Sequence, residues 1–515
     1  MVNDMKSIDK EQVRSAAIHI AACSTVEKNT ALMRIAHALT DNKGRIAEAN
    51  GRDVDKAMRS GLPGPIVKRL RMDEDKVMSV INGIYSLVEL PDPSGRQLFA
   101  TELSEGLTLR KITCPIGVIG IIFESRPDAL VQIACLCLKS GNAVILKGGS
   151  EAAETNRLLS GIISSATCGE GLPDGWITQL ETRAEINEIL KMDDCIDLLI
   201  PRGSNEFVRY IMENTRIPVI GHSDGICHCY VDAAANVDMA VRVTVDAKTQ
   251  YAAVCNATET LLVHRDIAGR FLPALWDALN GGSHDEGSDS RQGMSGGTIG
   301  GASGGTTADV ATGAAGGVSG GAIGGAASSA TGGTTAGAAT GAAGGAASSA
   351  TGDTVVGSAG SRKDATFITL RGCDETRQIL AGYPVEAATE ADWRAEYLDY
   401  TLAVKVVGSL NEAIEHINRY GSRHTDAILT DDTEAARLFM QLVDSANVYH
   451  NCSTRFSDGF RYGFGAEVGV STSKIHARGP VGLEGLVTYK YLLSGNGDIV
   501  ADYEEGRRKF THLPL

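Results

Sequence analysis

The sequence predicts an α/β protein with two doubly wound domains, and three observations lead to that prediction. Short apolar runs alternate with helix-like segments along most of the chain, as in parallel sheets covered by helices on both faces. The alternation stops near residue 280 and resumes after residue 362, so a different segment interrupts the second domain. The 515 residues, 43% of them hydrophobic and 22% charged, suffice for two or three domains with cores of their own.

Composition excludes several classes of function. The formal net charge is −15 and the chain has no basic stripe, so nucleic-acid binding is not expected. No run of about 18 apolar residues occurs, so no membrane span is expected. Residues 1–20 lack an apolar core followed by a small-residue cleavage site, and the eleven cysteines include no C-x-x-C pair. These features favour a cytoplasmic protein with reduced cysteines.

The first part of the chain is expected to form helices, a hairpin and then buried strands. Residues 7–90 carry apolar residues at helical spacing, which predicts several amphipathic helices. Residues 107–113, LTLRKIT, are expected to form one arm of an exposed hairpin. The runs PIGVIGIIFES (115–125) and NAVILKGG (142–149) are typical of strands buried on both faces, with a helix between them.

The same alternation then continues to the end of the second domain. A helix with a serine cap at its first residue is expected over 150–167. Residues 195–214 predict a strand, a tight glycine turn and a helix. The pattern restarts with a strand and helix at 258–279 and continues over 400–421 and 426–451.

The segment 280–362 differs from everything around it. It is mostly Gly, Ala, Ser and Thr, and GGAASSATG occurs at 324–332 and again at 344–352. Such a composition cannot bury enough apolar surface to offset the entropy lost on ordering. We therefore predict a flexible insertion on a surface loop that leaves activity intact. A silk-like or surface-binding repeat is the alternative.

The stretch GICHCYVD, residues 225–232, superficially suggests a metal site. In a strand, however, Cys227 and Cys229 point to one face and His228 to the other, so the three side chains cannot close on one ion. A buried strand is favoured, and we predict no metal site.

Glycine turns and loop-borne polar residues mark the candidate binding regions. Neither G-x-G-x-x-G after a strand nor G-x-x-x-x-G-K-[ST] occurs, but LKGGSE (146–151) and PRGSNEF (201–207) each follow a strand. Such turns place backbone amides where dinucleotides dock, although ordinary βα turns look the same. The segment 451–490 carries polar residues among glycines that suit an anionic substrate, or else cap a helix or bridge subunits: Thr454, Arg455, His476 and Arg478.

One cysteine stands out by its position. In QYAAVCNATETLLV, residues 250–263, Cys255 lies between small residues and just before a run typical of a buried strand. It is either a nucleophile or one more apolar core residue, because free cysteines are often buried.

Several motifs together resemble the gamma-glutamyl phosphate reductase (glutamate-5-semialdehyde dehydrogenase) family of the aldehyde dehydrogenase superfamily. They occur in the family's order and cover nearly the whole chain outside 280–362: PIGVIGIIFESRPDALVQIACLCLKSGNAVILKGG, IDLLIPRGSNEF, IPVIGHSDGICHCYVD, DAKTQYAAVCNATETLLV, VVGSLNEAIEHINRYGSRHTDAI, STRFSDG and GAEVGVSTSKIHARGPVGLEGLVTYK. The resemblance implies an aldehyde dehydrogenase-like fold. It assigns residues 1–250 to an NADP-binding domain with an oligomerisation hairpin near 98–113. Residues 251–450, interrupted by 280–362, then form the catalytic domain, and 451–515 form a substrate-binding loop, a return to the cofactor domain and an oligomerisation tail.

The resemblance also implies a chemistry for Cys255. It matches the superfamily's nucleophile, which would attack L-glutamyl 5-phosphate, expel phosphate and form a thioester. A nicotinamide would reduce that thioester to glutamate-5-semialdehyde, in the second step of proline biosynthesis. The Cys255 amide and the Arg126 side chain are the expected oxyanion donors. The expected substrate-binding residues are Arg126, Asn256, Thr454, Arg455, His476 and Arg478.

NADPH is the expected cofactor. The residues expected to bind it are Lys147, Gly148, Gly149, Ser150, Gly203 and Glu396. In NAD-preferring relatives an acidic residue follows the lysine by three positions and would repel a 2′-phosphate, whereas this chain has Ser150 there. The resemblance further implies a homo-oligomer. It also implies functional coupling to a separate glutamate 5-kinase.

Other functions stay open as alternatives. GHSDGICH, residues 221–228, contains no glutamate to activate water, which speaks against a hydrolytic semialdehyde dehydrogenase. A CoA-acylating dehydrogenase and a non-catalytic glycine-rich scaffold on a dead enzyme fold are the others. The chain also departs from the family pattern at YAAV (251–254), where RPST is frequent, and at Asp128 and His450.

Overall fold

The computed structural model describes residues 8–168, 171–181, 184–203, 205–221, 224–281 and 367–515. From residue 282 onward the expected insertion lies outside the described residues, so its flexibility stays a prediction. On either side of it, α11 (Arg265–Asn280) and β9 (Thr369–Gly372) continue the helix–strand alternation that the sequence predicted.

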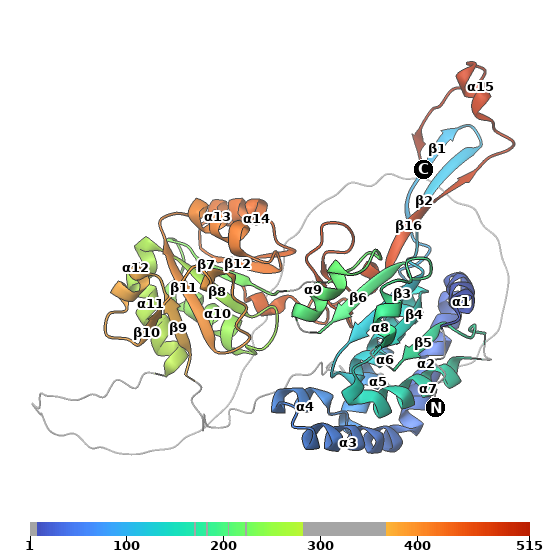
Figure 1. Cartoon of the computed structure of the whole chain (residues 1–515). Coiled ribbons are helices and arrows are strands. Elements are labelled where there is room, and N and C mark those ends of the chain that lie inside the picture. The colour runs from blue at the N-terminus through green and yellow to red at the C-terminus, as the bar shows by residue number, and fades with distance from the viewer. Residues whose placement is uncertain (1–7, 169–170, 182–183, 204, 222–223, 282–366) are drawn as a thin grey trace, which may run out of the picture. The chain divides into compact units, whose positions relative to one another are not determined.

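A four-stranded parallel sheet forms the centre of the first domain (Figure 1). Its order is β5-β4-β3-β6, and its strands are β3 (Val118–Phe123), β4 (Ala143–Lys147), β5 (Ile177–Leu180) and β6 (Leu198–Arg202). Every residue of β3 and β4 is buried. Ile119 and Ile121 enter one core and Val118 and Ile122 another, which confirms strands covered on both faces.

Helices supply both of these cores. One core receives α2 (Thr25–Asp41), α5 (Glu74–Glu89), α6 (Pro127–Ser140) and α7 (Ala153–Thr167). The other receives α8 (Ala184–Ile189) and α9 (Asn205–Glu213), while α1 (Lys10–Ala22) contributes to both. A smaller cluster joins α3 (Lys43–Arg59) to α4 (Gly64–Leu70). Within the described part of the chain, no helix is long and apolar enough to cross a membrane.

The helix after β4 differs from the prediction at its start. Ser150–Ala152 form a 3-10 turn, η1, and α7 begins only at Ala153. The N-cap of α7 is Ala152, which makes no side-chain capping bond, so the predicted serine cap is wrong. The Ala152 N–H donates to the Gly149 carbonyl at 3.2 Å, and this backbone turn already satisfies a donor that a cap would bind.

The second domain contains a seven-stranded parallel sheet of order β10-β9-β11-β8-β7-β12-β13 (Figure 1). Its other strands are β7 (Cys227–Val231), β8 (Thr258–His264), β10 (Val385–Ala387), β11 (Thr401–Val407), β12 (Thr425–Leu429) and β13 (Asn447–His450). Cys229 and Val231 of β7 pack with α10 (Val237–Thr249) and α11, whereas Tyr230 packs with α13 (Leu410–Tyr420) and α14 (Thr433–Leu442). The buried strand predicted for GICHCYVD is confirmed. The short α12 (Asp374–Ile379) precedes β10.

An antiparallel sheet forms an arm (Figure 1). β1 (Gln97–Ser104) and β2 (Leu107–Pro115) make the predicted hairpin. β16 (Val487–Ser494) pairs along the whole of β2, and β17 (Leu513–Pro514) pairs with β1. The short α15 (Val500–Glu504) lies between these two strands in sequence, so the C-terminal segment is built onto the hairpin.

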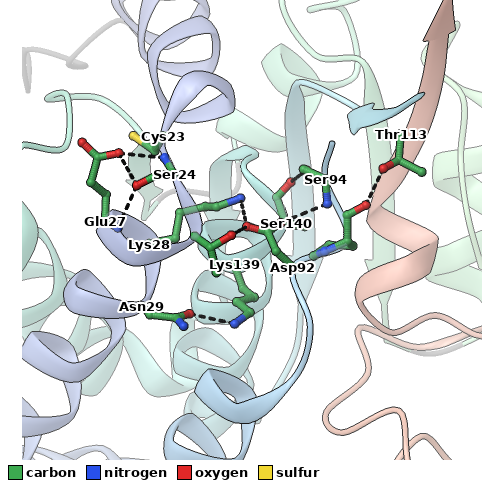
Figure 2. Close-up of polar contacts among 12 residues, drawn as sticks. Cys23, Ser24, Glu27, Lys28, Asn29, Asp92, Ser94, Thr113, Lys139 and Ser140 are labelled. Carbon is green, nitrogen blue, oxygen red and sulfur yellow. Dashed lines mark hydrogen bonds and ion pairs between the residues drawn. The ribbon is translucent and has the colours of Figure 1, made fainter. Parts of the chain in front are cut away.

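Buried polar groups fix the base of the arm to the helices (Figure 2). Lys28 of α2 is 2% exposed, and its Nζ lies 2.6 Å from Oδ2 of Asp92. Burial acts to raise the pKa of Asp92, but Lys28, the Ser94 N–H and the Thr25 hydroxyl together outweigh it, and the pKa lies below its usual value. The Ser94 N–H donates to Asp92 at 2.9 Å, and its hydroxyl donates to the carbonyl of Ser140 in α6 at 3.0 Å. The arm is therefore anchored to α2 and α6.

Candidate active site

Cys255 lies in the loop between α10 and β8, at the amino end of the seven-stranded sheet. Its carbonyl accepts a hydrogen bond from the Cys227 thiol at 3.2 Å. A Cβ added at Gly225 would lie 2.2 Å from the same carbonyl oxygen, so only glycine permits this close approach of the two backbones. The Cys255 side chain is half-buried. The backbone that carries the thiol is thus held by contacts with Cys227 and Gly225, while the residue as a whole is only half-buried.

The segment after β13 clamps the residues that follow Cys255. Thr454, in the 3-10 turn η3 (Thr454–Phe456), is fully buried and donates from its hydroxyl to the Asn256 carbonyl at 2.7 Å. The Asn256 side-chain amide donates to the Ser457 carbonyl at 2.8 Å. Asn256 Oδ1 has no hydrogen-bond partner among the described residues. Thr454 therefore supports the cysteine loop from within the fold.

Two arginines lie within electrostatic range of the Cys255 thiol. Arg455 is buried and donates from Nε to Gln250 Oε1 at 3.0 Å. Arg202, at the end of β6, is half-buried and donates from Nη1 to the Glu467 carbonyl at 3.5 Å. Burial lowers the pKa of both guanidinium groups, and negative charge on Cys255 acts in the opposite direction on each pKa. Arginine stays protonated in proteins, so the guanidinium groups of Arg202 and Arg455 place two positive charges near the Cys255 thiol.

Arg126 is the N-cap residue of α6. Its Nη2 lies 3.2 Å from Oδ2 of buried Asp128, and Lys76 Nζ lies 3.6 Å from the same oxygen. Burial acts to raise the pKa of Asp128, but Arg126 and Lys76 outweigh it, so the pKa lies below its usual value. Asp128, one of the departures from the family pattern, is therefore a carboxylate that orients Arg126.

Arg478 bonds to a carboxylate that is not part of this hydrogen-bonded cluster, and His476 precedes Arg478 by two positions. Both are exposed residues. Arg478 donates from Nη2 to the carbonyl of Asp444 at 3.1 Å and to its Oδ1 at 3.0 Å, and Lys474 pairs with the other carboxylate oxygen at 2.7 Å. The structure joins Arg478 to this surface carboxylate, and the roles of His476 and Arg478 at the substrate stay predictions.

A cavity of about 350 Å³ opens at the carboxyl end of β3 and β4. Four of the residues predicted to bind the cofactor line it together: Lys147, Gly148, Gly149 and Ser150. Side chains of α8 and α9 line it too: Ile186, Asn187, Phe207 and Tyr210. Aromatic and apolar side chains that face a lysine and glycine backbone fit the adenosine part of a dinucleotide.

Glu151, also in this cavity, is held by the loop after β3. Its Oε1 accepts hydrogen bonds from the N–H of Ser125 at 2.6 Å and from the Ser125 hydroxyl at 2.8 Å. Ser150, next to it, is exposed. The carboxylate that follows Ser150 in the sequence is thereby engaged with another part of the protein.

The other predicted cofactor residues meet at the turn after β6. Glu396 accepts a hydrogen bond at Oε2 from the side-chain amide of Asn205 at 2.6 Å, and that amide also donates to Asp224 at 2.8 Å. Asn205 opens α9, two residues after Gly203. The structure therefore brings Glu396 to the glycine turn, although the two are 193 positions apart in the chain, from 203 to 396.

The chain is similar to known proteins over most of its length. The profile of the aldehyde dehydrogenase family matches residues 7–296. The gamma-glutamyl phosphate reductase of Acetivibrio thermocellus is 52% identical over 501 residues, which cover 97% of this chain and 96% of the relative. That of Pelotomaculum thermopropionicum is 52% identical over 512 residues, covering 99% and 98%. The chain belongs to the gamma-glutamyl phosphate reductase family.

Solved structures agree with this membership. The crystal structure of gamma-glutamyl phosphate reductase from Thermotoga maritima has a TM-score of 0.76 at 33% identity and covers 95% of this chain and 98% of its own. An acetylating aldehyde dehydrogenase from Geobacillus thermoglucosidasius, at 16% identity and a TM-score of 0.55, shares the fold. The predicted aldehyde dehydrogenase-like fold is confirmed, and the chain is an oxidoreductase of the gamma-glutamyl phosphate reductase family.

Sequence reasoning missed four charged residues of this gamma-glutamyl phosphate reductase family member. Arg202 ends a buried strand as Lys147 does, so the same positional argument applied to both. Glu467 is the one charged residue in the glycine-rich run GAEVGV, and such a position in a loop could have indicated a site residue. Lys248 and Glu259 form a fully buried pair with Nζ 2.5 Å from Oε2. Lys248 lies in α10 and Glu259 in β8, and neither has a neighbouring residue in the sequence that marks it as buried or paired.

Proposed function

We propose that this chain catalyses, in the cytoplasm, the NADPH-dependent reduction of L-glutamate 5-phosphate to L-glutamate 5-semialdehyde and phosphate, the second step of proline biosynthesis from glutamate. Family membership supports the substrate and the reaction. The observation that carries the proposal is the setting of Cys255, a half-buried thiol on a clamped backbone within electrostatic range of Arg202 and Arg455. An acyl phosphate is an anionic electrophile, so cations beside a nucleophilic thiol suit it.

The covalent path runs through Cys255. Its thiolate attacks the 5-acyl carbon, the bond from that carbon to the phosphate oxygen breaks, phosphate leaves and a thioester remains. The Cys255 N–H and the Arg126 side chain donate hydrogen bonds to the negative oxygen of each tetrahedral intermediate. NADPH, when bound, supplies the hydride for the thioester carbon. The carbon–sulfur bond then breaks, which releases the aldehyde and returns the thiolate to Cys255.

The cofactor would use two regions of the first domain. Lys147, Gly148, Gly149 and Ser150 hold the adenosine end in the 350 Å³ cavity, and Gly203 and Glu396 contact the dinucleotide nearer the nicotinamide. A neutral Ser150 tolerates a 2′-phosphate, and the hydrogen bonds from Ser125 to Glu151 reduce the repulsion that this neighbouring carboxylate would exert. These features support NADP over NAD.

Arg455, Asn256 and Thr454 are the substrate-binding candidates that the contacts support best. Negative charge on Cys255 acts to raise the pKa of Arg455, so the two groups interact. Hydrogen bonds of Thr454 and Asn256 connect the Cys255 loop to the segment that carries Arg455. His476 and Arg478 stay proposed substrate ligands, for which Arg478 would exchange its bonds with Asp444 for bonds to the substrate. Because an acyl phosphate hydrolyses readily, a separate glutamate 5-kinase that supplies it would work in functional coupling with this enzyme.

The domain division follows the same reasoning. The predicted boundary at residue 250 lies too late, because β7 and α10 belong to the seven-stranded sheet and its core. We therefore propose that the cofactor domain ends before β7, that the catalytic domain begins with β7, and that 451–515 form the substrate loop, the return to the cofactor domain and the tail. The arm, built from the hairpin near 98–113 and the tail, would join two copies of the chain. Its exposed apolar side chains support a homo-oligomer: Leu98, Phe99, Tyr489, Tyr491, Leu492, Leu493, Leu513 and Leu515.

The reverse reaction tests this proposal directly. Purified protein is mixed with glutamate-5-semialdehyde and NADP⁺, and NADPH formation is followed by absorbance with and without phosphate. We expect turnover only with phosphate, and a loss of at least about a thousandfold in Cys255→Ala. Cys373→Ala removes another half-buried cysteine and should keep the wild-type rate.

The other outcomes favour different functions. Equal rates without phosphate would mean that water resolves the thioester, which favours the hydrolytic dehydrogenase. A requirement for CoA in place of phosphate would favour a CoA-acylating enzyme. No NADPH under any condition would favour a non-catalytic scaffold.

A further inference from the structure

Arg202 and Arg126 leave the four-stranded sheet at the same edge. Arg202 is the last residue of β6 and is paired in register with Phe123, the last residue of β3. Arg126 follows Phe123 by three positions. The Arg202 guanidinium packs beside Gly469, where an added Cβ would lie 3.9 Å from Arg202 Nε. Two cations from neighbouring strand ends therefore share one side of the site.

The neighbours of Arg202 neutralise it only in part. Burial lowers the pKa of Arg202 and Arg126 lowers it further, while Glu467, Cys255 and Asp128 act to raise that pKa. Asp128 is already paired with Arg126 at 3.2 Å. Burial raises the pKa of Glu467 to about 7, so near neutral pH this carboxyl carries only part of a charge. A half-buried guanidinium in this setting gains stability from an added anion.

We propose that Arg202 binds the phosphate group of the acyl phosphate, and inorganic phosphate in the reverse reaction, with Arg126 on the other side of the anion. This inference rests on the proposed function of the site. A phosphate dianion between two guanidinium groups would replace their mutual repulsion with charge-assisted hydrogen bonds.

Chemistry decides between the two anionic ends of the substrate. The carbon that Cys255 attacks is bonded directly to a phosphate oxygen, whereas the α-carboxylate lies at the far end of the glutamyl chain. Arg202 interacts with the charge of Cys255 and ends the strand beside the one that leads to Arg126, so it is better placed for the phosphate than for the α-carboxylate. Arg455, the other arginine near the thiol, is buried and donates from Nε to Gln250 at 3.0 Å, whereas half-buried Arg202 makes a longer bond, 3.5 Å, to the Glu467 carbonyl, so Arg202 is the better placed of the two.

The test separates thioester formation from phosphate binding. Without phosphate, wild-type protein with NADP⁺ and glutamate-5-semialdehyde should give a burst of NADPH equal to the concentration of Cys255, and phosphate should then start turnover. In Arg202→Met we expect the burst to persist and the KM for phosphate to rise at least about tenfold, the effect of losing a charged hydrogen bond. Arg202→Lys keeps the charge without the fork and should show an intermediate KM. Arg265→Met, which removes an arginine that pairs with Glu375 on the outer surface, should leave the KM for phosphate unchanged.

Two results would overturn the inference. One is an unchanged phosphate KM in Arg202→Met with an intact burst. The other is a rise in the semialdehyde KM alone, which would assign Arg202 to the α-carboxylate. A wild-type protein without any burst would contradict the proposed function instead.

Phosphate protection of Cys255 is a second readout that needs no turnover. Inorganic phosphate should slow alkylation of Cys255 by iodoacetamide in the wild type, and Arg202→Lys should lose part of that protection. This comparison holds even if Arg202→Met does not fold. Equal protection in the two proteins would overturn the inference. If Arg202→Lys loses protection but the wild type shows no burst of NADPH, the anion site at Arg202 stands and the proposed reaction is contradicted.

Discussion

Glu467 gives the site a group that titrates near neutral pH. Burial raises its pKa to about 7 against the opposing effect of Arg202, and Asp458 and Cys255 also act to raise that pKa. The Gly459 N–H donates to its Oε2 at 2.9 Å, which lowers the pKa but does not prevail. As the pH rises through 7, the carboxyl loses its proton, pairs more strongly with Arg202 and repels an incoming dianion.

Anion affinity should therefore fall as the pH rises. We use sulfate as the probe, because it stays a dianion from about pH 6 to 8 whereas phosphate itself titrates. The inhibition constant of sulfate against phosphate should rise by at least about threefold over that range, since an ionised Glu467 competes for Arg202. Glu467→Gln should give a flat profile, and Glu375→Gln, on the outer surface, should keep the wild-type slope. An identical slope in the wild type and Glu467→Gln would contradict this role.

Local pattern places site residues but does not assign their roles. Lys147 ends an apolar run and Cys255 precedes a strand, yet the pattern left Cys255 as either a nucleophile or a core residue, and the family resemblance supplied the proposed role of each. Arg202 also ends a buried strand, but the prediction for this turn named Gly203 and not the arginine before it. The bonds of Arg478 to Asp444, across 34 residues, depend on tertiary packing that no local pattern encodes.

A buried ion pair joins the two elements that flank the cysteine loop. Lys248 near the end of α10 and Glu259 in β8 are both fully buried, and Glu259 Oε1 also accepts the Leu398 N–H at 3.2 Å. Burial raises the pKa of Glu259 to about 7, and Lys248 acts against that rise. Removing the lysine alone would leave a carboxyl without its cation in the core. Lys248→Met should therefore lower the free energy of unfolding by about 3–5 kcal/mol.

Urea unfolding followed by tryptophan fluorescence measures this cost. The double variant Lys248→Met with Glu259→Leu removes both charges, so it should recover most of the loss. A double variant as unstable as Lys248→Met would mean that packing volume, and not the unpaired carboxyl, causes the effect.

Elements were predictable to different degrees for physical reasons. Strands buried on both faces read as continuous apolar runs, which is why β3 and β4 match the expected segments. β8 matches through Leu261–Val263, which follow three buried polar residues. The start of α7 was not predictable from its serine. The 3-10 turn before it depends on local backbone bonding, and Glu151 within that turn bonds to Ser125 in a separate loop.

In the molecule as a whole, the arm exposes several large apolar side chains on one sheet. β16 is an edge strand of the arm sheet, and seven of its eight residues are exposed. Tyr489, Tyr491, Leu492 and Leu493 lie among these exposed residues. An exposed edge strand that carries large apolar side chains favours association, because it offers both unpaired backbone groups and apolar area. Its anchor at Asp92 and Lys28 holds this surface on the cofactor domain (Figure 2).

The arm should therefore determine the oligomeric state. Tyr491 and Leu493 are 55% and 58% exposed in the single chain, so replacing both with lysine should cost the isolated fold little. In an oligomer the same lysines would be buried without partners, which costs several kcal/mol at each copy of the interface. Sedimentation velocity should then show the wild type as an oligomer and the double variant as a monomer with an unchanged circular dichroism spectrum. Ile18→Lys, at a residue of α1 that is 72% exposed, should sediment as the wild type does. An arm variant that keeps the wild-type sedimentation coefficient would mean that other surfaces hold the copies together.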